Sequence, residues 1–233
     1  MARHKANTTK LEIIQVATQM FMERGFTDTS AKAISDELNI STGNLTFHFP
    51  TKEHLLAEMV QMLCDFQWKM MTRVTQDGNS SLLAMCLELM AMAAICEENE
   101  VMKDFYICAY THPMTLEIIR KNDAKRAKMI FGTYCPDWRE EDFLGSEILV
   151  SGIEYTTLMT TNSSLSLERR ISGALNTIMM IYAIPEELRQ TKIKKVLAMD
   201  YRGMGRRILQ EFTEYIKEVN EQALEELTQK PLR

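Results

Sequence analysis

A run of small polar side chains between two large apolar ones, residues 41–49, is the part of the sequence best suited to chemistry with another molecule. Leu45 and Phe49 are spaced as inward anchors of a short helix, so the positions around them point outward. An outward Asn44 can hydrogen-bond with adenine in the major groove, and an outward Phe47 can contact a thymine methyl group. The full outward set is Thr42, Gly43, Asn44, Thr46 and Phe47. The pattern indicates a polar helix face that is suited to contact with another molecule.

The neighbouring residues carry the signals of a helix-turn-helix that would hold this run outward. Ser41 is a favourable N-cap for a short helix ending near residue 48, and Asn39 tolerates the left-handed backbone of a tight turn. A short helix is expected before it, over residues 30–38. Two helices joined by a turn of about three residues form a helix-turn-helix.

A longer helix is expected on each side of the motif. The first begins at a capping box, residues 9–12 (TKLE), and ends at Gly25, which can adopt the left-handed conformation. The other follows Pro50, is capped by Thr51 and carries an apolar stripe. The stripe consists of Leu55, Leu56, Met59, Met62, Leu63, Phe66 and Met70.

The remaining sequence predicts further helices over residues 80–97, 101–111, 114–134, 139–161, 165–183, 186–201 and 204–228. With 9 Gly and 5 Pro in 233 residues, the chain has little of the turn punctuation that β sandwiches and doubly wound sheets need. We expect an all-α protein. Its domains are expected to be a helix-turn-helix domain over residues 1–50 and a larger helical domain over residues 51–233.

Charge and composition limit the classes of function. The net charge is −5, divided into +1 for residues 1–52 and −6 for the remainder, so only a local patch can meet nucleic acid. The five cysteines form no C-x-x-C pair and are interpreted as buried hydrophobes in a reducing compartment. The longest near-apolar run, residues 82–96, is too short for a membrane span. A cytoplasmic protein without membrane contact is predicted.

Residues 34–55, which read ISDELNISTGNLTFHFPTKEHL, follow a first helix ending in MFMERGF and the entry DTSAKAI. Together these segments resemble the N-terminal DNA-binding domain of the TetR family of bacterial transcriptional regulators. The resemblance implies a homodimer that binds double-stranded operator DNA and is released by a small-molecule effector. Such a release would tilt the helix that begins near residue 52, and so change the spacing of the two recognition helices.

The resemblance also extends the set of expected DNA contacts. Lys52 corresponds to the family's phosphate-binding lysine, at a helix N-terminus that favours an anion. Thr46 stands where the family usually has tyrosine, so the contact made by that phenol is in doubt. The complete expected set is Ser30, Lys32, Ser41, Thr42, Gly43, Asn44, Thr46, Phe47, His48 and Lys52.

The larger domain carries weaker patterns. Two neighbouring helices, with apolar positions from Phe143 to Met159 and from Leu167 to Met179, suit either a dimer interface or core packing within one chain. Expected ligand contacts, chosen by residue type alone, are Tyr106, Tyr110, His112, Tyr134, Trp138 and Tyr155. The 18 methionines suit an adaptable apolar pocket but also ordinary core filling. Residues 186–233 form an extension that would cover the pocket or the dimer.

The sequence lacks the motifs of the enzyme classes that a helical protein of this size could belong to. A metal-dependent helical bundle would need Glu-x-x-His pairs, which the four histidines do not provide. There is no G-x-S-x-G, P-loop or G-x-G-x-x-G motif, so neither an enzyme nor a bound cofactor or metal is expected. The alternative is a DNA-anchored adaptor whose helical body binds a protein partner. The basic residues between Lys192 and Arg207 are interpreted as a solvated helix face rather than a second nucleic-acid surface.

Overall fold

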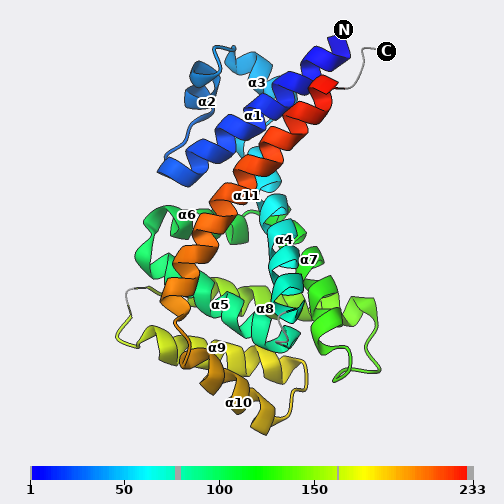
Figure 1. Ribbon diagram of the computed structural model, residues 1–233, viewed down its shortest axis with the longest axis vertical. Helices are drawn as coiled ribbons and strands as arrows, with labels where there is room; N and C mark the ends of the chain where they lie inside the picture. The colour runs from blue at the N-terminus through cyan, green and yellow to red at the C-terminus, as the bar shows by residue number, and fades with distance from the viewer. Residues whose placement is uncertain (1, 77–79, 162, 230–233) are drawn as a thin grey trace.

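The computed structural model describes residues 2–76, 80–161 and 163–229. Within these ranges every regular element is an α-helix, as predicted (Figure 1). The helices are α1 (Ala2–Arg24), α2 (Ala31–Glu37), α3 (Thr42–His48), α4 (Lys52–Gln76), α5 (Ser81–Glu98), α6 (Glu100–Thr111), α7 (Pro113–Phe131), α8 (Glu140–Met159), α9 (Leu167–Ile181), α10 (Glu186–Leu197) and α11 (Tyr201–Gln229).

Helices α2 and α3 form the predicted helix-turn-helix. Ser30 accepts a hydrogen bond from the Ala33 amide at 3.0 Å, and Ser41 accepts one from the Asn44 amide at 3.1 Å. Asn39 has a φ of 52° and Gly25 a φ of 91°, so both turns use the left-handed region where the sequence predicted it. The caps and turns of this motif are local in sequence, which explains why the sequence predicts them well.

The expected start of α1 is wrong. The helix begins at Ala2, so residues 9–12 lie inside it instead of capping it. No glycine or proline precedes them, and residues 2–8 include the good helix formers alanine and lysine, so nothing stops the helix from extending upstream.

The larger domain is built around α5. This helix is apolar on nearly all sides and is covered by α4, α6, α8, α9, α10 and α11. A helix that is hydrophobic all round is stable only when it is enclosed. Helix α4 runs from the helix-turn-helix into this body and contacts α1, α5 and α7.

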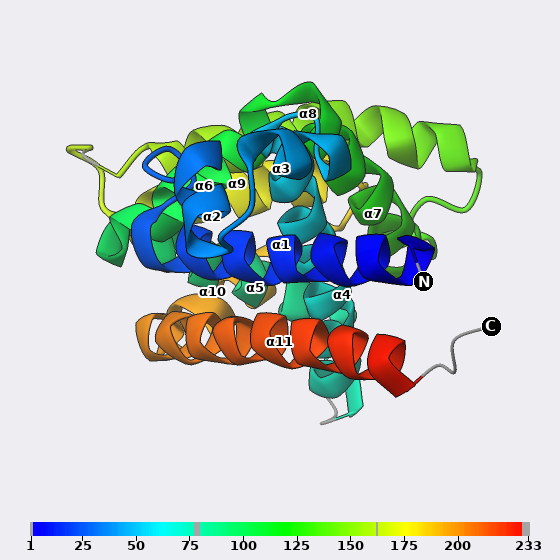
Figure 2. The same cartoon turned by 90° about the horizontal axis from the view of Figure 1, so that it is seen from above.

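The last helix joins the two parts of the molecule. Helix α11 packs against α5 and α4 and continues along α1, to which it lies antiparallel in both views (Figures 1 and 2). Phe212 and Ile216 on its inner side are buried. The segment expected to cover the pocket or the dimer therefore also contacts the N-terminal domain.

Candidate nucleic-acid interface and effector cavity

Helix α3 presents an unpacked outer face. Leu45 and Phe49 are buried, as expected of inward anchors, whereas Phe47 is 78% exposed. The other predicted outward positions, namely Thr42, Gly43, Asn44 and Thr46, are also exposed, and so is the N-cap Ser41. Such a rod of short polar side chains with one aromatic tip fits the width of a major groove.

The side chains of α3 are only lightly restrained. Thr46 donates its hydroxyl to the Gly43 carbonyl at 3.2 Å, and Ser41 is occupied as the N-cap. The ring of Phe47 meets His48 edge-on at 5.2 Å, so half-buried His48 supports the exposed aromatic. Asn44 keeps its amide side chain exposed.

Lys52 holds the N-terminal domain together. Its ammonium donates to the carbonyls of Phe26 at 2.6 Å and Thr29 at 2.8 Å, and it lies 4.1 Å from the centre of the Phe26 ring. The start of α4 is thereby fastened to the loop between α1 and α2. Two of the three ammonium donors are used in these hydrogen bonds.

The two expected contacts on α2 lie at the surface. Lys32 is exposed and paired with Asp36 at 2.6 Å, one turn along the helix. Ser30 caps the helix and is exposed. An exposed pair of this kind contributes little to stability.

Helix α6 also contacts the loop between α1 and α2, through a residue that the sequence did not indicate. Asp104 of α6 accepts the Thr27 amide at 2.9 Å and the Thr27 hydroxyl. A Cβ at Gly25 would lie 3.0 Å from Asp104. No sequence motif marks Asp104, because its partner lies 77 residues away in the chain.

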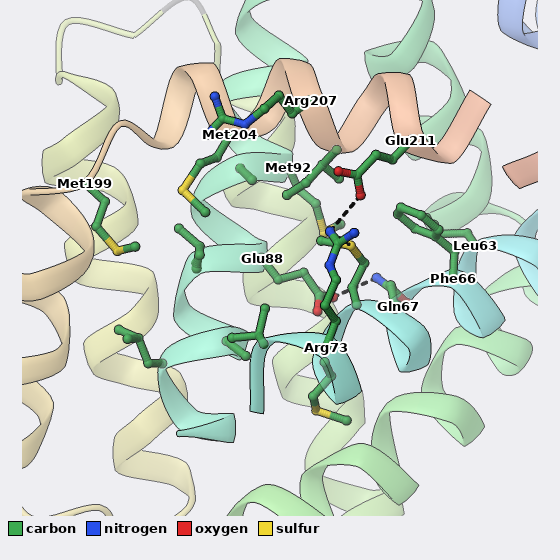
Figure 3. A pocket seen from close by; sticks show the side chains of 18 of the residues that line it. Leu63, Phe66, Gln67, Arg73, Glu88, Met92, Met199, Met204, Arg207 and Glu211 are labelled. Atoms are coloured by element: carbon green, nitrogen blue, oxygen red, sulfur yellow. Dashed lines mark hydrogen bonds and ion pairs between the residues drawn. The ribbon is translucent and has the colours of Figure 1, made fainter. Parts of the chain in front are cut away.

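A cavity of about 280 Å³ lies in the body between α4, α5 and α11 (Figure 3). Its walls are mainly apolar. Five methionines line it, namely Met70, Met71, Met92, Met199 and Met204. Gln67 donates to Glu88 at 2.8 Å on one side, and Arg73 of α4 pairs with Glu211 of α11 at 2.7 Å on another.

A second, smaller cavity of about 40 Å³ contains a buried polar cluster. Arg126 pairs with Glu88 and, at 3.2 Å, with Asp123. The Tyr110 hydroxyl donates to Glu154 at 3.0 Å, and the Tyr182 hydroxyl donates to Glu147. More carboxyls than cations therefore converge on this site.

Burial determines the protonation of the cluster. It raises the pKa of Glu147 to about 8, with the charge of Asp123 adding to the effect. Burial likewise raises the pKa of Glu154 well above its usual range and raises that of Asp123. For Arg126, burial alone would lower the pKa, but the neighbouring Glu88 and Asp123 raise it. Burial thus favours the neutral form of these carboxyls, whereas Glu88 and Asp123 favour the charged form of Arg126.

The structure separates the six expected ligand contacts. Tyr106 lines the larger cavity and Tyr110 the smaller one. His112 accepts the Met114 amide at 3.3 Å as the N-cap of α7, and Trp138 packs on Phe143. Neither cavity is lined by His112, Tyr134, Trp138 or Tyr155. Residue type alone could not indicate which aromatics face open space.

Helices α8 and α9 divide their apolar residues between the core and the surface. Most positions of the predicted set are buried, including Phe143, Ile171 and Ile178. Ile148 remains 58% exposed, and open space surrounds Gly152. Other exposed apolar or small positions on these two helices are Leu144, Gly145, Leu149, Gly173 and Met180.

The basic residues near the start of α11 are largely paired within the chain. Arg202 contacts Glu97 and Glu98, each at 3.0 Å, and Arg206 contacts Glu98 at 3.0 Å. These contacts support a role in fastening α11 to the end of α5.

Helices α1 to α3, with the polar face of α3 turned outward, have the arrangement of a helix-turn-helix DNA-binding domain. The family model described as "Bacterial regulatory proteins, tetR family" matches residues 13–59. The match lies in the N-terminal segment, which is therefore similar to the DNA-binding domain of that family.

Individual relatives match over the same region. The HTH-type transcriptional repressor KstR2 of Mycobacterium tuberculosis is 32% identical over 62 residues, which are 27% of this chain and 31% of that protein. The uncharacterized HTH-type transcriptional regulator YuxN of Bacillus subtilis is 32% identical over 68 residues, 29% of this chain and 23% of that protein. The chain thus spans about a third or less of these two relatives, which are both transcriptional regulators by name.

Among solved structures, the chain is similar to CprB, a TetR family protein from S. coelicolor, with 20% identity and a TM-score of 0.42 over 89% of this chain and 99% of that one. A gamma-butyrolactone receptor described as ArpA-like has 19% identity and a TM-score of 0.43, over 88% of this chain and 99% of that one. Within the described residues, none of the helices is long and apolar enough to cross a membrane.

Proposed function

We propose that the protein is a sequence-specific transcriptional repressor that binds operator DNA as a homodimer and is released by a small-molecule effector. The observation that carries the proposal is the outer face of α3, where a 78% exposed Phe47 stands among exposed polar residues. Exposing so much aromatic surface costs hydration free energy unless a partner covers it. The proposal gives the chain no catalytic role and places it in the cytoplasm, with the chromosomal DNA.

The roles of the side chains follow from what each can reach. In this proposal Asn44 reads adenine, Thr42 and Thr46 donate to bases or phosphates, and Phe47 covers a thymine methyl group. The positioning contacts to phosphate come from the remaining set, Ser30, Lys32, Ser41, His48 and Lys52. Gly43 lets the backbone approach the groove closely.

The dimer would form through α8 and α9. A pair of recognition helices must be spaced about one helical turn of DNA apart, ~34 Å, to read a palindromic site. The exposed Ile148 and Leu149 on α8 and Met180 on α9, with glycines among them, offer the apolar close-packing surface that two copies need. The domain division at residues 50 and 51 remains part of this proposal.

A small effector is favoured over a protein partner because the body contains an apolar cavity of about 280 Å³, close to the lower end of ligand pockets, roughly 300–1,000 Å³. Helix α4 lines this cavity, and its first residue, Lys52, is bonded to the α1–α2 loop. A ligand that displaces α4 would therefore move the N-terminal domain and change the spacing of the two α3 helices.

Footprinting on the intergenic DNA beside the gene tests the proposal. We expect one protected palindrome with half-sites about one turn apart, ~34 Å. Absence of any protected site at moderate salt would overturn the DNA-binding assignment. A protected single half-site would overturn the dimer assignment and leave the DNA-binding assignment standing.

A further inference from the structure

One wall of the cavity between α4, α5 and α11 is formed by the C-terminal helix and the turn before it. Met204, Arg207, Ile208 and Glu211 all come from α11, and Met199 comes from the turn before it. Figure 3 shows Met204, Arg207 and Glu211 along one side of the cavity, with Phe66 and Gln67 of α4 on another. The C-terminal helix is thus part of the site.

Most charges at this cavity are already neutralised. Glu211 is paired with Arg73 at 2.7 Å, and Glu88 is paired with Arg126. Arg207 is exposed, and no ion pair or hydrogen bond of its side chain is found among the described residues. The rim therefore carries one uncompensated positive charge above an apolar interior.

The interior suits a flexible hydrocarbon. Methionine side chains are unbranched and adapt to ligands of different shape. A volume of about 280 Å³ is close to the lower end of small-molecule pockets, roughly 300–1,000 Å³, and so suits a short acyl chain. Buried apolar area would supply the affinity, and Arg207 would orient the polar end.

From these observations we infer that the cavity between α4, α5 and α11 binds an amphipathic organic anion, with its chain among the methionines and its acidic head at Arg207. This inference rests on the proposed function for its biological meaning, because the anion would then be the effector. It assigns the effector site to the α11 side of the body and not to the polar cluster around Glu147.

The position of α11 gives the ligand a route of action. Gly205 brings α11 so close to α5 that a Cβ at this position would lie 3.1 Å from the Ala91 carbonyl oxygen. This end of α11 therefore cannot move closer to α5. The Arg73–Glu211 pair ties α11 to α4 beside the cavity. A bound chain would push α11 away from α4, and the same helix contacts α1 of the N-terminal domain.

Calorimetric titration of the full chain with decanoate, 1-decanol and decylamine tests the inference without DNA. We expect decanoate to bind about fivefold more tightly than 1-decanol, as an exposed ion pair allows, and decylamine to bind most weakly. Arg207→Gln should remove the preference for decanoate and leave the affinity for 1-decanol unchanged. Arg206→Gln is the matched control, because Arg206 is exposed on the same helix but is not among the residues that line the cavity.

A second variant tests the location independently of charge. Ala84 lines the cavity, and Ala84→Met should fill part of it and weaken binding of decanoate and 1-decanol alike. Equal affinity for the three probes, or unchanged decanoate binding by Arg207→Gln, would overturn the inference. Because these titrations contain no DNA, failure of operator binding in the footprint would overturn the repressor assignment alone.

Discussion

An exposed aromatic at the centre of a polar helix face is the clearest functional signal at the scale of single residues. Phe47 contributes nothing to the core, since Leu45 and Phe49 already anchor α3. Its retention on the surface makes sense if the ring is covered in a complex. The sequence predicted which residues of α3 point outward, because a short helix with two buried anchors has only one arrangement.

Phe47→Ala should weaken binding to the footprinted operator by about 1–3 kcal/mol, because a base-edge contact is lost, while thermal stability stays unchanged. Fluorescence anisotropy with labelled operator measures the affinity. Leu165→Ala is the matched control, because Leu165 is a 54% exposed apolar residue in the loop before α9. If both variants bind like the wild type, Phe47 does not contact DNA.

Lys52 combines a structural role with an expected DNA contact, and the two can be separated. Lys52→Met removes the hydrogen bonds to Phe26 and Thr29 and should lower the free energy of unfolding by about 1–3 kcal/mol. Urea denaturation measures this loss. If the third ammonium donor binds phosphate, the slope of log affinity against log salt should also decrease by about one. If the variant is less stable but the salt dependence of DNA binding is unchanged, Lys52 only holds the α1–α2 loop and does not contact phosphate.

The pKa of Glu147 gives a pH dependence of known sign. The folded protein keeps this carboxyl protonated up to about pH 8, whereas the unfolded chain releases the proton near 4.5. The folded state binds more protons in that interval, so the free energy of unfolding falls as the pH rises, by up to ~1.4 kcal/mol per pH unit. Asp123 opposes ionisation of Glu147, and Arg126 and Arg120 favour it.

Glu147→Gln should therefore reduce the loss of thermal stability between about pH 6 and pH 8. The glutamine carbonyl can still accept the Tyr182 hydroxyl, so the packing is retained. Melting curves at the two pH values provide the measurement. Glu117→Gln, an exposed position on α7 paired with Lys121, should keep the wild-type pH dependence. The same decline in both variants would show that Glu147 is ionised in the folded protein.

At the scale of elements, the sequence predicted what local signals determine. Ser30, Asn39 and Ser41 fix the helix-turn-helix through caps and a left-handed turn within a dozen residues. The start of α1 was missed because a capping box is only one way to begin a helix. The cavity lining was mostly missed because it depends on α4, α5 and α11 meeting in space, which no local pattern specifies.

The outer face of α8 carries a prediction at this scale. Ile148→Arg places a charge at the centre of the proposed dimer surface and should convert the protein to monomers, because two buried like charges would repel. Light scattering coupled to gel filtration measures the mass. Met129→Arg on α7 is the matched control, because Met129 is 53% exposed and lies outside this face. If the Ile148 variant is still a dimer, the interface lies elsewhere on the molecule. If the wild-type protein is a monomer, the proposed dimer is wrong.

At the scale of the whole molecule, α11 connects parts that are far apart in sequence. It lines the cavity, pairs with α4 through Glu211 and Arg73, and reaches α1, where the Asn220 side-chain amide donates to the Thr18 hydroxyl at 3.1 Å. Asn220 and Thr18 are both buried and are separated by 202 positions. The sequence predicted a helix over residues 204–228 but could not show its partner.

A buried amide bonded across two helices specifies how they are aligned, because the amide loses a partner if α11 slides along α1. Asn220→Leu replaces this bond with apolar contact of similar size, and Thr18 can still donate to the Ile14 carbonyl, which lies 2.8 Å from its hydroxyl. We expect stability and ligand-free operator affinity to change little. The decanoate concentration that releases half of the operator should rise several-fold, although the calorimetric affinity for decanoate stays the same. Anisotropy measures the release.

A double-mutant cycle separates this coupling from a general loosening of the domain. Thr18→Val removes the same bond from the α1 side, so Asn220→Leu, Thr18→Val and the double variant should show nearly equal losses of effector response. Additive losses would mean that each residue acts through other neighbours. Retention of the full response in all three variants would show that decanoate acts through α4 alone, with α11 serving only as the wall of the cavity.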